Sequence, residues 1–245
     1  MTSFTVLQPE NWLEPRKILV VLAHPDDPEF FCGGTLLRWI HAGHEVEYLL
    51  LTNGDKGSQD LTQSPKDLIA LRQNEQKKAA ALIGASRITF LDEPDGFLQL
   101  TDNIRKAVVR KIREVCPHII VSSDPLTYYF REIYINHPDH KMAGEITLSA
   151  VFPAAGNPFY YPDLIQQEGL EPHTPDEVWL AMPEKANVSL DITPEWKEKI
   201  SALHAHASQI GDPAIFDRNM LSRRVEGSSE ESPRFEEHFR RLFKR

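Results

Sequence analysis

Residues 17–34 read KILVVLAHPDDPEFFCGG, and their pattern indicates the fold class. The run ILVVLA is continuously apolar and rich in branched side chains, which is typical of a strand covered on both faces of a parallel sheet. Polar residues follow at once. The next segment, TLLRWIHAG, carries apolar residues at helical spacing up to Gly43, a helix stop signal. The stretch therefore predicts a strand, a polar loop and a helix.

The same alternation continues along the chain. Further strands are expected at residues 45–52, 87–92, 119–123, 177–182 and 187–192. Further helices are expected at residues 68–85, 101–116, 141–152, 194–210 and 235–243. Strands that alternate with helices predict an α/β fold with a Rossmann-like, doubly wound and mostly parallel sheet.

We expect residues 1–245 to form a single domain. Its core is predicted at residues 16–150, and C-terminal strands and helices at 181–245. Residues 151–180, between them, would shape a substrate pocket or a subunit contact, and the Pro-rich and aromatic-rich stretch at 157–176 is expected at the surface.

Composition narrows the classes of partner. The formal net charge is -9, from 27 basic and 36 acidic residues, so no basic excess is present to bind a phosphate backbone. The two cysteines make no disulfide framework and show no CxxC spacing, which suits a reducing cytoplasm. No apolar stretch approaches the roughly 18 residues of a membrane span. We therefore expect a cytoplasmic protein with neither a nucleic-acid partner nor a membrane span.

Two clusters of similar composition follow two of the predicted strands. The first contains His24, Asp26 and Asp27, and the second contains His137, Asp139 and His140. Ligands of open α/β sheets bind beyond the carboxyl ends of the strands, where both clusters fall. A catalytic zinc takes three imidazole or carboxylate ligands and leaves a position for water. HPDD alone reads equally well as a turn, but the pair of clusters favours a shared metal site.

The clusters hold more groups than a metal needs. A carboxylate beside the bound water, either Asp26 or Asp27, could act as general base and then return its proton to a leaving amine. A second imidazole, if protonated, could stabilise the oxyanion of a tetrahedral intermediate, and either His137 or His140 could serve.

The motifs AHPDDPEFFCGGTL and HPDH closely resemble those of the LmbE-like, or PIG-L-like, family of zinc-dependent N-deacetylases. These enzymes act on N-acetylglucosamine-containing lipids, thiol precursors and related amino sugars. The resemblance extends over most of the chain, through LTNGDKG, RQNEQKKAAALIGA, the PDG turn and HASQ at 206–209.

The resemblance implies a role for several residues. Three of them would bind the metal: His24, Asp27 and His140. Asp26 would be the base and His137 would assist at the oxyanion. Asp139 would orient an imidazole from behind the metal, and the remaining matches imply substrate contacts for Arg72 and Asp95.

The expected activity is removal of an acetyl group from an amino sugar of the N-acetylglucosamine type. The expected cofactor is Zn²⁺, although Fe²⁺ or another divalent metal suits the same ligands. Homo-oligomerisation is a further expectation from the family. One alternative is a zinc amidase for a thiol S-conjugate or another amide. The other is a metal-binding or sugar-binding protein without turnover, which would not need the carboxylate of Asp26.

Overall fold

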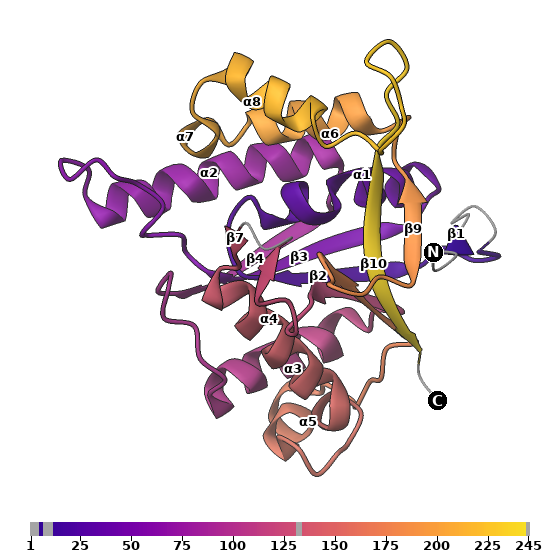
Figure 1. Cartoon of the computed structure of the whole chain (residues 1–245). Helices are drawn as coiled ribbons and strands as arrows, with labels where there is room; N and C mark the ends of the chain where they lie inside the picture. The colour runs from indigo at the N-terminus through magenta and orange to yellow at the C-terminus, as the bar shows by residue number, and fades with distance from the viewer. Residues whose placement is uncertain (1–4, 7–11, 131–133, 244–245) are drawn as a thin grey trace.

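The computed structural model describes residues 5–6, 12–130 and 134–243, and these build one sheet between two layers of helices (Figure 1). The eight strands, in their order across the sheet, are β1 (Thr5–Val6), β9 (Val188–Asp191), β10 (Glu236–Phe243), β8 (Glu177–Ala181), β5 (Ile119–Ser123), β2 (Lys17–Leu22), β3 (Glu45–Thr52) and β4 (Arg87–Glu93). Only β10 runs antiparallel to its neighbours, so the predicted mostly parallel α/β sheet is confirmed.

Strand β2 is buried on both faces, as its uninterrupted apolar sequence predicts. Ile18, Val20 and Leu22 point into the core on one side of the sheet. Leu19 and Val21 alternate with them and point into the core on the other side. A strand with an unbroken apolar run such as residues 18–22 can fill both cores only in the interior of a covered sheet, and β2 lies between β5 and β3.

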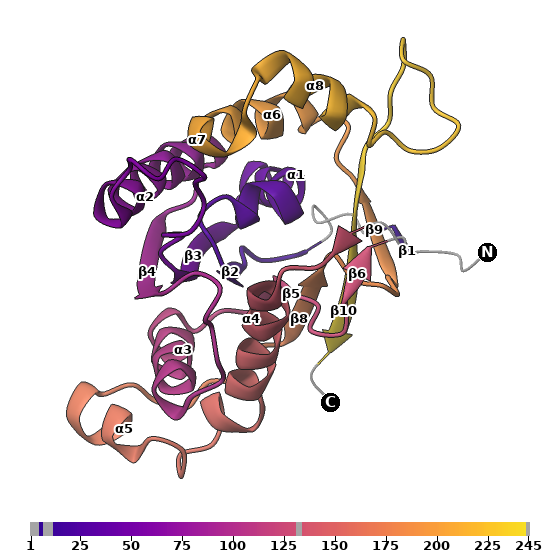
Figure 2. The same cartoon turned by 60° about the vertical axis from the view of Figure 1, so that its left-hand side comes forward.

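Each face of the sheet carries its own group of helices (Figures 1 and 2). One face is covered by α1 (Asp27–His41), α2 (Pro65–Ile83) and α6 (Trp196–His204), with α7 (Ala207–Ile210) and α8 (Pro213–Leu221) outside them. The other face is covered by α3 (Asp102–Val115), α4 (Pro138–Ser149), the π-helical turn η2 (Ala150–Ala155) and α5 (Pro162–Glu168). A small hairpin of β6 (Tyr129–Phe130) and β7 (Tyr134–Ile135) stands apart from the sheet.

The helix expected at residues 235–243 is wrong, because this segment is strand β10. Its burial alternates: Glu237 and Phe239 are buried, whereas the residues between and beside them are more exposed. The strand pairs with β9 through its first half and with β8 through its second half. The two neighbouring strands leave a gap that only an extended segment can fill with ladder hydrogen bonds.

The helix expected at residues 194–210 is interrupted. Helix α6 ends at His204, and α7 begins at Ala207, so His206 lies at the break instead of on a continuous helical surface. Its side chain is turned inward and is buried. The chain changes direction at this break, which brings His206 back under α1.

The region of residues 151–180 is buried in part, including Leu164 of the stretch 157–176 that was expected at the surface. Ala154, Ala155 and Leu164 are fully enclosed against α3 and α4. The Arg113 guanidinium holds this segment by donating to the carbonyls of Ala154 and Ala155, and also to those of residues 157, 160 and 161. One buried cation therefore replaces the regular hydrogen bonds that this irregular stretch lacks.

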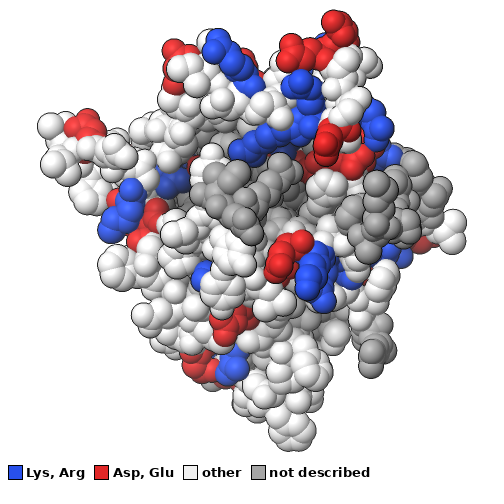
Figure 3. All heavy atoms as spheres, in the orientation of Figure 1, with Lys and Arg blue, Asp and Glu red and all other residues white. Residues whose placement is uncertain are grey.

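Charged side chains of both signs are interspersed on the face drawn in Figure 3. Among the described residues, no helix combines the length and the apolar content needed to span a bilayer.

Candidate metal centre and active site

The two clusters meet at the carboxyl edge of the sheet. The loop from β2 into α1 carries His24, and the N-terminus of α4 carries His137 and His140. The three imidazole rings lie together, with centroid separations of 4.6 Å between His24 and His137, 5.2 Å between His24 and His140, and 5.3 Å between His137 and His140. The turn after β4 adds Asp95, which is buried beside them. Parallel strands therefore bring the distant motifs to one place.

Asp27 lies between two of these imidazoles. Its Oδ2 is 3.4 Å from His24 Nδ1, and its Oδ1 is 3.2 Å from His140 Nε2. Asp27 is the first residue of α1, and its Oδ2 also accepts the backbone N–H of His24 at 2.8 Å. The carboxylate is nearly fully buried, and its hydrogen bond with the His24 backbone fixes its direction at the start of the helix.

Other side chains orient the two imidazoles from behind. His24 Nε2 lies 3.1 Å from Asp95 Oδ1 and 3.3 Å from Asp139 Oδ2. The ring of His140 pairs through Nδ1 with Asn136 Oδ1 at 2.9 Å. With a proton on each of these outer nitrogens, His24 Nδ1 and His140 Nε2 present lone pairs to Asp27.

This arrangement fits a divalent cation. Lone pairs of two imidazoles facing a carboxylate repel one another unless a positive charge lies between them. Two donors of a tetrahedral site with bonds of about 2.0–2.1 Å stand about 3.3–3.4 Å apart, close to the two separations at Asp27. Nitrogen and carboxylate oxygen donors are those that zinc and similar divalent metals take in hydrolases. The partners behind His24 and His140 are of the kind that hold metal-binding histidines.

The pKa shifts of His24 and Asp27 also favour a positive charge in this site. Burial alone would lower the pKa of His24, but Asp27, Asp139 and Asp95 outweigh it and raise that pKa well above its ordinary value. Burial likewise opposes ionisation of Asp27, yet His140 and His24 hold its pKa well below the usual range. The chain thus keeps Asp27 ionised and draws a proton, or a cation in its place, to the imidazoles.

Asp26 differs from its neighbour Asp27. Its backbone has φ 93° and ψ -29°, a conformation that costs a residue with a side chain about 1–3 kcal/mol. Burial and the negative charge of Asp27 raise the pKa of Asp26 to about 6, although Arg72 opposes them. A carboxyl with a pKa near neutrality can both take up and release a proton, as general acid–base catalysis requires.

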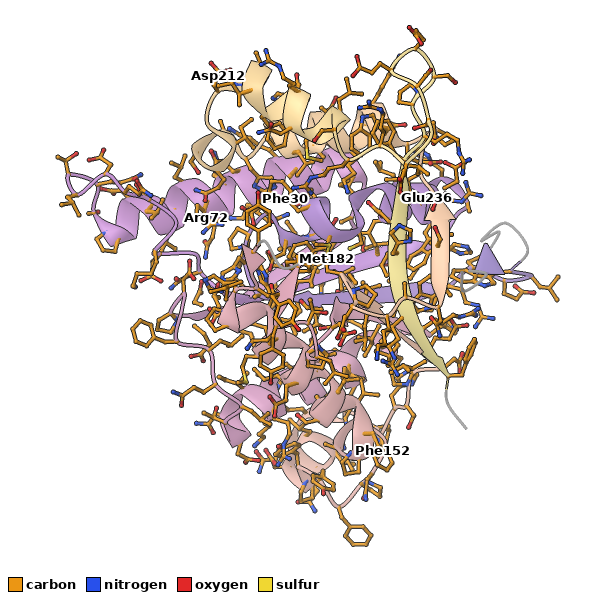
Figure 4. All side chains as sticks on the ribbon, viewed as in Figure 1. Phe30, Arg72, Phe152, Met182, Asp212 and Glu236 are labelled. Carbon is orange, nitrogen blue, oxygen red and sulfur yellow. The ribbon has the colours of Figure 1, made fainter. Side chains whose placement is uncertain are left out.

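Arg72 lies behind Asp26 and is buried, on the side of α2 that faces the sheet (Figure 4). Its Nη2 donates to Asp26 Oδ2 at 3.2 Å and to the Pro25 carbonyl at 2.7 Å, and its Nη1 donates to the Gly54 carbonyl at 3.0 Å. Nη1 also lies 3.7 Å from Asp95 Oδ2. Arg72 was expected to contact substrate, but the contacts that the structure shows for its guanidinium are with Asp26, Pro25, Gly54 and Asp95 of the protein itself.

His137 is the N-cap of α4, and its side chain is partly exposed. Its Nδ1 accepts the backbone N–H of Asp139 at 3.2 Å. This bond requires an unprotonated Nδ1, so a neutral ring carries its proton on Nε2. Burial, together with His24 and His140, lowers the pKa of His137 and favours that neutral form.

Asp139 has a second task besides facing His24. Its two carboxylate oxygens accept the backbone N–H groups of Gly96, at 2.7 Å, and Leu98, at 3.2 Å. The residue therefore ties the turn after β4 to α4, which fixes Asp95 and His24 relative to each other. The orienting role that the family resemblance implies for Asp139 stays a prediction.

Several residues outside the predicted set of site residues also surround the site. Asn136 holds His140, and the buried set of Glu29, Gln76 and His206 lies directly behind Asp26. Three of these four lie in the quoted motifs: Glu29 in AHPDDPEFFCGGTL, Gln76 in RQNEQKKAAALIGA and His206 in HASQ. Cys32 is fully buried, and a Cβ on Gly34 would lie 2.6 Å from the Ile192 side chain, so both residues serve the packing of α1.

The sequence matches a de-N-acetylase family model and the sequences of known deacetylases. The family model of PIG-L, GlcNAc-PI de-N-acetylase, matches residues 19–151. The chain is 35% identical over 207 residues to a diacetylchitobiose deacetylase of Thermococcus kodakarensis, covering 84% of this chain and 74% of the relative. It is 31% identical over 176 residues to a 1D-myo-inositol 2-acetamido-2-deoxy-alpha-D-glucopyranoside deacetylase of Rhodococcus jostii, covering 62% of this chain and 58% of the relative.

Solved structures extend the likeness to the fold. The N,N'-diacetylchitobiose deacetylase of Pyrococcus horikoshii superposes with a TM-score of 0.83 at 27% identity, covering 94% of this chain and 84% of that one. The 4-carboxy-2-hydroxymuconate hydratase GalB of Pseudomonas putida superposes with a TM-score of 0.73 at 22% identity, covering 94% of this chain and 97% of that one. At this identity the second match concerns the fold alone, because one fold can host unrelated reactions.

Proposed function

We propose that this chain, which belongs to the PIG-L family of de-N-acetylases, removes the acetyl group from an amino sugar of the N-acetylglucosamine type. The reaction consumes water and releases acetate and the free amine. The observation that carries this proposal is the position of Asp27 between His24 Nδ1 and His140 Nε2, with Asp26 next to it. The names of the relatives, which are deacetylases of N-acetylated sugars, support the same class of substrate.

We assign the metal to His24, Asp27 and His140, with zinc as the cofactor and Fe²⁺ as the other candidate. The family and the His and Asp cluster support a divalent metal, and the nitrogen and oxygen donors suit zinc. When bound, such a cation supplies Lewis-acid polarisation of the acetamide carbonyl and lowers the pKa of a water molecule. The free cysteines are consistent with the cytoplasmic location that belongs to the same proposal.

Asp26 is the proposed general base. Arg72 occupies its Oδ2, which leaves Oδ1 to take a proton from the attacking water. Its pKa of about 6 makes it mostly ionised at neutral pH, yet basic enough to accept that proton. Oδ1 then delivers the proton to the amine nitrogen as the bond between nitrogen and the acetyl carbon breaks.

His137 is the proposed donor to the oxyanion, in its neutral form. Because Nδ1 accepts from the Asp139 backbone, the Nε2–H is available to donate toward the carbonyl oxygen as negative charge develops there. A neutral donor differs from the protonated imidazole considered from the sequence. The pKa of His137, which burial and the neighbouring histidines lower, supports this change.

Asp95 and Arg72 take supporting roles in this proposal. The buried Arg72 restrains Asp26, and Asp95 Oδ1 orients His24. The substrate contacts implied for both by the family resemblance stay predictions. Asp95 is the better placed of the two, because it lies 3.7 Å from the partly exposed ring of His137.

The test combines metal content with acetate release. Purified protein is analysed for metal, then assayed on N-acetylglucosamine and N,N'-diacetylchitobiose before chelation, after chelation and after zinc is restored. We expect about one metal ion per chain and acetate release that is lost with the metal and recovered with it. The matched pair of variants is His140→Ala and His204→Ala, because His204 is the last residue of α6 and pairs with Asp217 of α8.

Retention of metal by His140→Ala would contradict the assignment of the ligands. Loss of metal by His204→Ala as well would mean that the assay reports general damage. Bound metal without acetate release from any amino sugar would contradict the proposed substrate class and direct the search to other amides, including thiol S-conjugates.

A further inference from the structure

The backbone of Asp26 is held in its unusual conformation by a side chain from another helix. Asp26 has φ 93° at the start of α1, and its backbone N–H faces α2. There it donates to Gln76 Oε1 at 2.7 Å. A buried N–H without an acceptor would be unfavourable, so Gln76 of α2 compensates for a conformation that the loop would otherwise avoid.

Gln76 is itself held in one orientation. Its side chain is fully buried, and its Nε2 donates to both oxygens of Glu29, each at 3.1 Å. A carboxylate accepts but does not donate, so the amide nitrogen of Gln76 must face Glu29 and its oxygen must face Asp26. His206 Nε2 pairs with Glu29 Oε2 at 3.0 Å from the far side.

These contacts form a continuous chain from His206 through Glu29 and Gln76 to the backbone of Asp26. All three side chains behind Asp26 are buried, which removes competition from water. Arg72 acts on a different part of the same residue, because it binds the Asp26 carboxylate and the Pro25 carbonyl. The backbone and the carboxylate of Asp26 are thus restrained by separate residues of α2.

We propose that Gln76 is a positioning residue: it fixes the backbone of Asp26, and thereby the direction in which Asp26 Oδ1 faces, while Glu29 and His206 fix Gln76. The inference rests on the proposed function, since it assigns a consequence to Asp26 as the base. Gln76 itself touches neither water nor substrate in this role. Its effect is on the rate of proton transfer and not on metal or sugar binding.

The first test replaces Gln76 with methionine, which keeps the length of the side chain and removes both hydrogen bonds. Displacement of a catalytic group by about 1 Å costs on the order of 100-fold in rate. We expect kcat to fall by about 10- to 100-fold, with KM within about 2-fold of wild type and about one metal ion per chain. Gln73→Met is the matched control, because Gln73 lies on the same helix and bonds Asp92 at its exposed side.

The second test exchanges donor and acceptor along the chain. Gln76→Glu alone sets two carboxylates against each other and is expected to reduce kcat at least as far as Gln76→Met. The double variant Gln76→Glu/Glu29→Gln restores the pattern. Its carboxylate, now on α2, can accept from the Asp26 backbone and from the new amide on α1, while the oxygen of that amide accepts from His206. We expect its kcat to return to within about 5-fold of wild type, since residues in one network are not additive.

A crystal structure of Gln76→Met supplies a readout that does not depend on activity. The expected result is that Asp26 leaves the positive-φ region, or that its carboxylate turns, while α1 and α2 keep their places. An unchanged Asp26, an unchanged kcat, or a double variant no better than Gln76→Glu would each overturn the proposal. If wild-type protein releases acetate from no amino sugar, the proposed function fails, and the crystal structure still decides whether Gln76 positions Asp26.

Discussion

His140 Nε2 lies 3.2 Å from Asp27 Oδ1, and the two residues belong to helices on opposite faces of the sheet. Asp27 opens α1 on one face, and His140 lies in the first turn of α4 on the other. The two atoms meet only when both helical layers are docked at the carboxyl edge. A cation held between them therefore links the layers to each other, and its binding must favour the folded state.

Metal should therefore stabilise the protein against heat. Zinc at about 100 times its dissociation constant contributes about 2.7 kcal/mol. For a chain of this size we expect a rise in Tm of about 5–10 °C over the chelated protein. His140→Ala should abolish the rise, while His204→Ala should retain it. Thermal unfolding with and without chelator measures the effect, and an equal rise in His140→Ala would place the stabilising metal elsewhere.

Asp26→Asn should separate catalysis from metal binding. The amide keeps the shape of the carboxyl but cannot accept the proton, so kcat should fall by about 100- to 10,000-fold. The metal content should remain about one per chain, because Asp26 faces Arg72 and is not among the assigned ligands. Acetate release and metal analysis on the same preparation test this prediction. Near-full activity with bound metal would show that another group is the base.

The buried pair of His206 and Glu29 should make stability depend on pH. Burial alone would lower the pKa of His206, but Glu29, Asp26 and Glu75 raise it above 6.5 in the folded protein. A raised folded pKa means that the pair stabilises fully below pH 6.5 and that this contribution is lost as pH rises through the folded pKa.

The measurement is the urea midpoint of chelated protein between about pH 5.5 and 9, for wild type and His206→Gln. We expect the midpoint of wild type to exceed that of the variant most at the acid end, and the difference to shrink as pH rises. A difference that stays constant across this range would mean that His206 stabilises the fold as a neutral side chain.

The buried pair of Lys199 and Glu237 should be important for stability. Lys199 Nζ lies 2.7 Å from Glu237 Oε1 and donates to the Phe30 carbonyl, and Glu237 accepts from the backbone of Gly34 and Thr35 inside α1. Lys199→Met leaves Glu237 buried without its cation and should reduce the free energy of unfolding by about 3–5 kcal/mol.

Lys197→Met is the control for this substitution, because Lys197 lies on the same helix and is less buried. Its free energy of unfolding should change by less than about 0.5 kcal/mol, as is usual at the surface. Urea denaturation of the two variants decides the matter. A loss of similar size in both would mean that the charge of Lys199 is not what stabilises β10 against α1.

The sequence was sufficient to predict the mostly parallel sheet and the meeting of the two motifs at its carboxyl edge. The apolar run of β2 can be stable only between two cores, and the alternation of strands with helices then requires a mostly parallel sheet. The carboxyl ends of parallel strands share an edge, so HPDD and HPDH had to converge. Local pattern and topology determine these features, and both are properties of the order of residues.

The C-terminal segment shows where pattern was insufficient. Phe235 and Phe239 are four residues apart, a spacing that suits one face of a helix and, equally, alternate positions of a strand. Glu237 lies between them and is buried, so the apolar alternation of a strand is interrupted by a charged residue. The hydrogen-bonding edges of β8 and β9 decided the conformation, and they lie far away along the chain.

The burial and the hydrogen-bond partners of the polar residues behind the site depended most of all on the tertiary structure. Arg72, Gln76, Glu29 and His206 lie in motifs that resemble those of the family, but their spacing alone does not distinguish them from solvated residues of an exposed helix surface. The packing of α2 and of the break before α7 against α1 encloses them and gives each a partner. A sequence records which polar groups exist, but the partner that each must find once water is excluded is decided only when the helices dock.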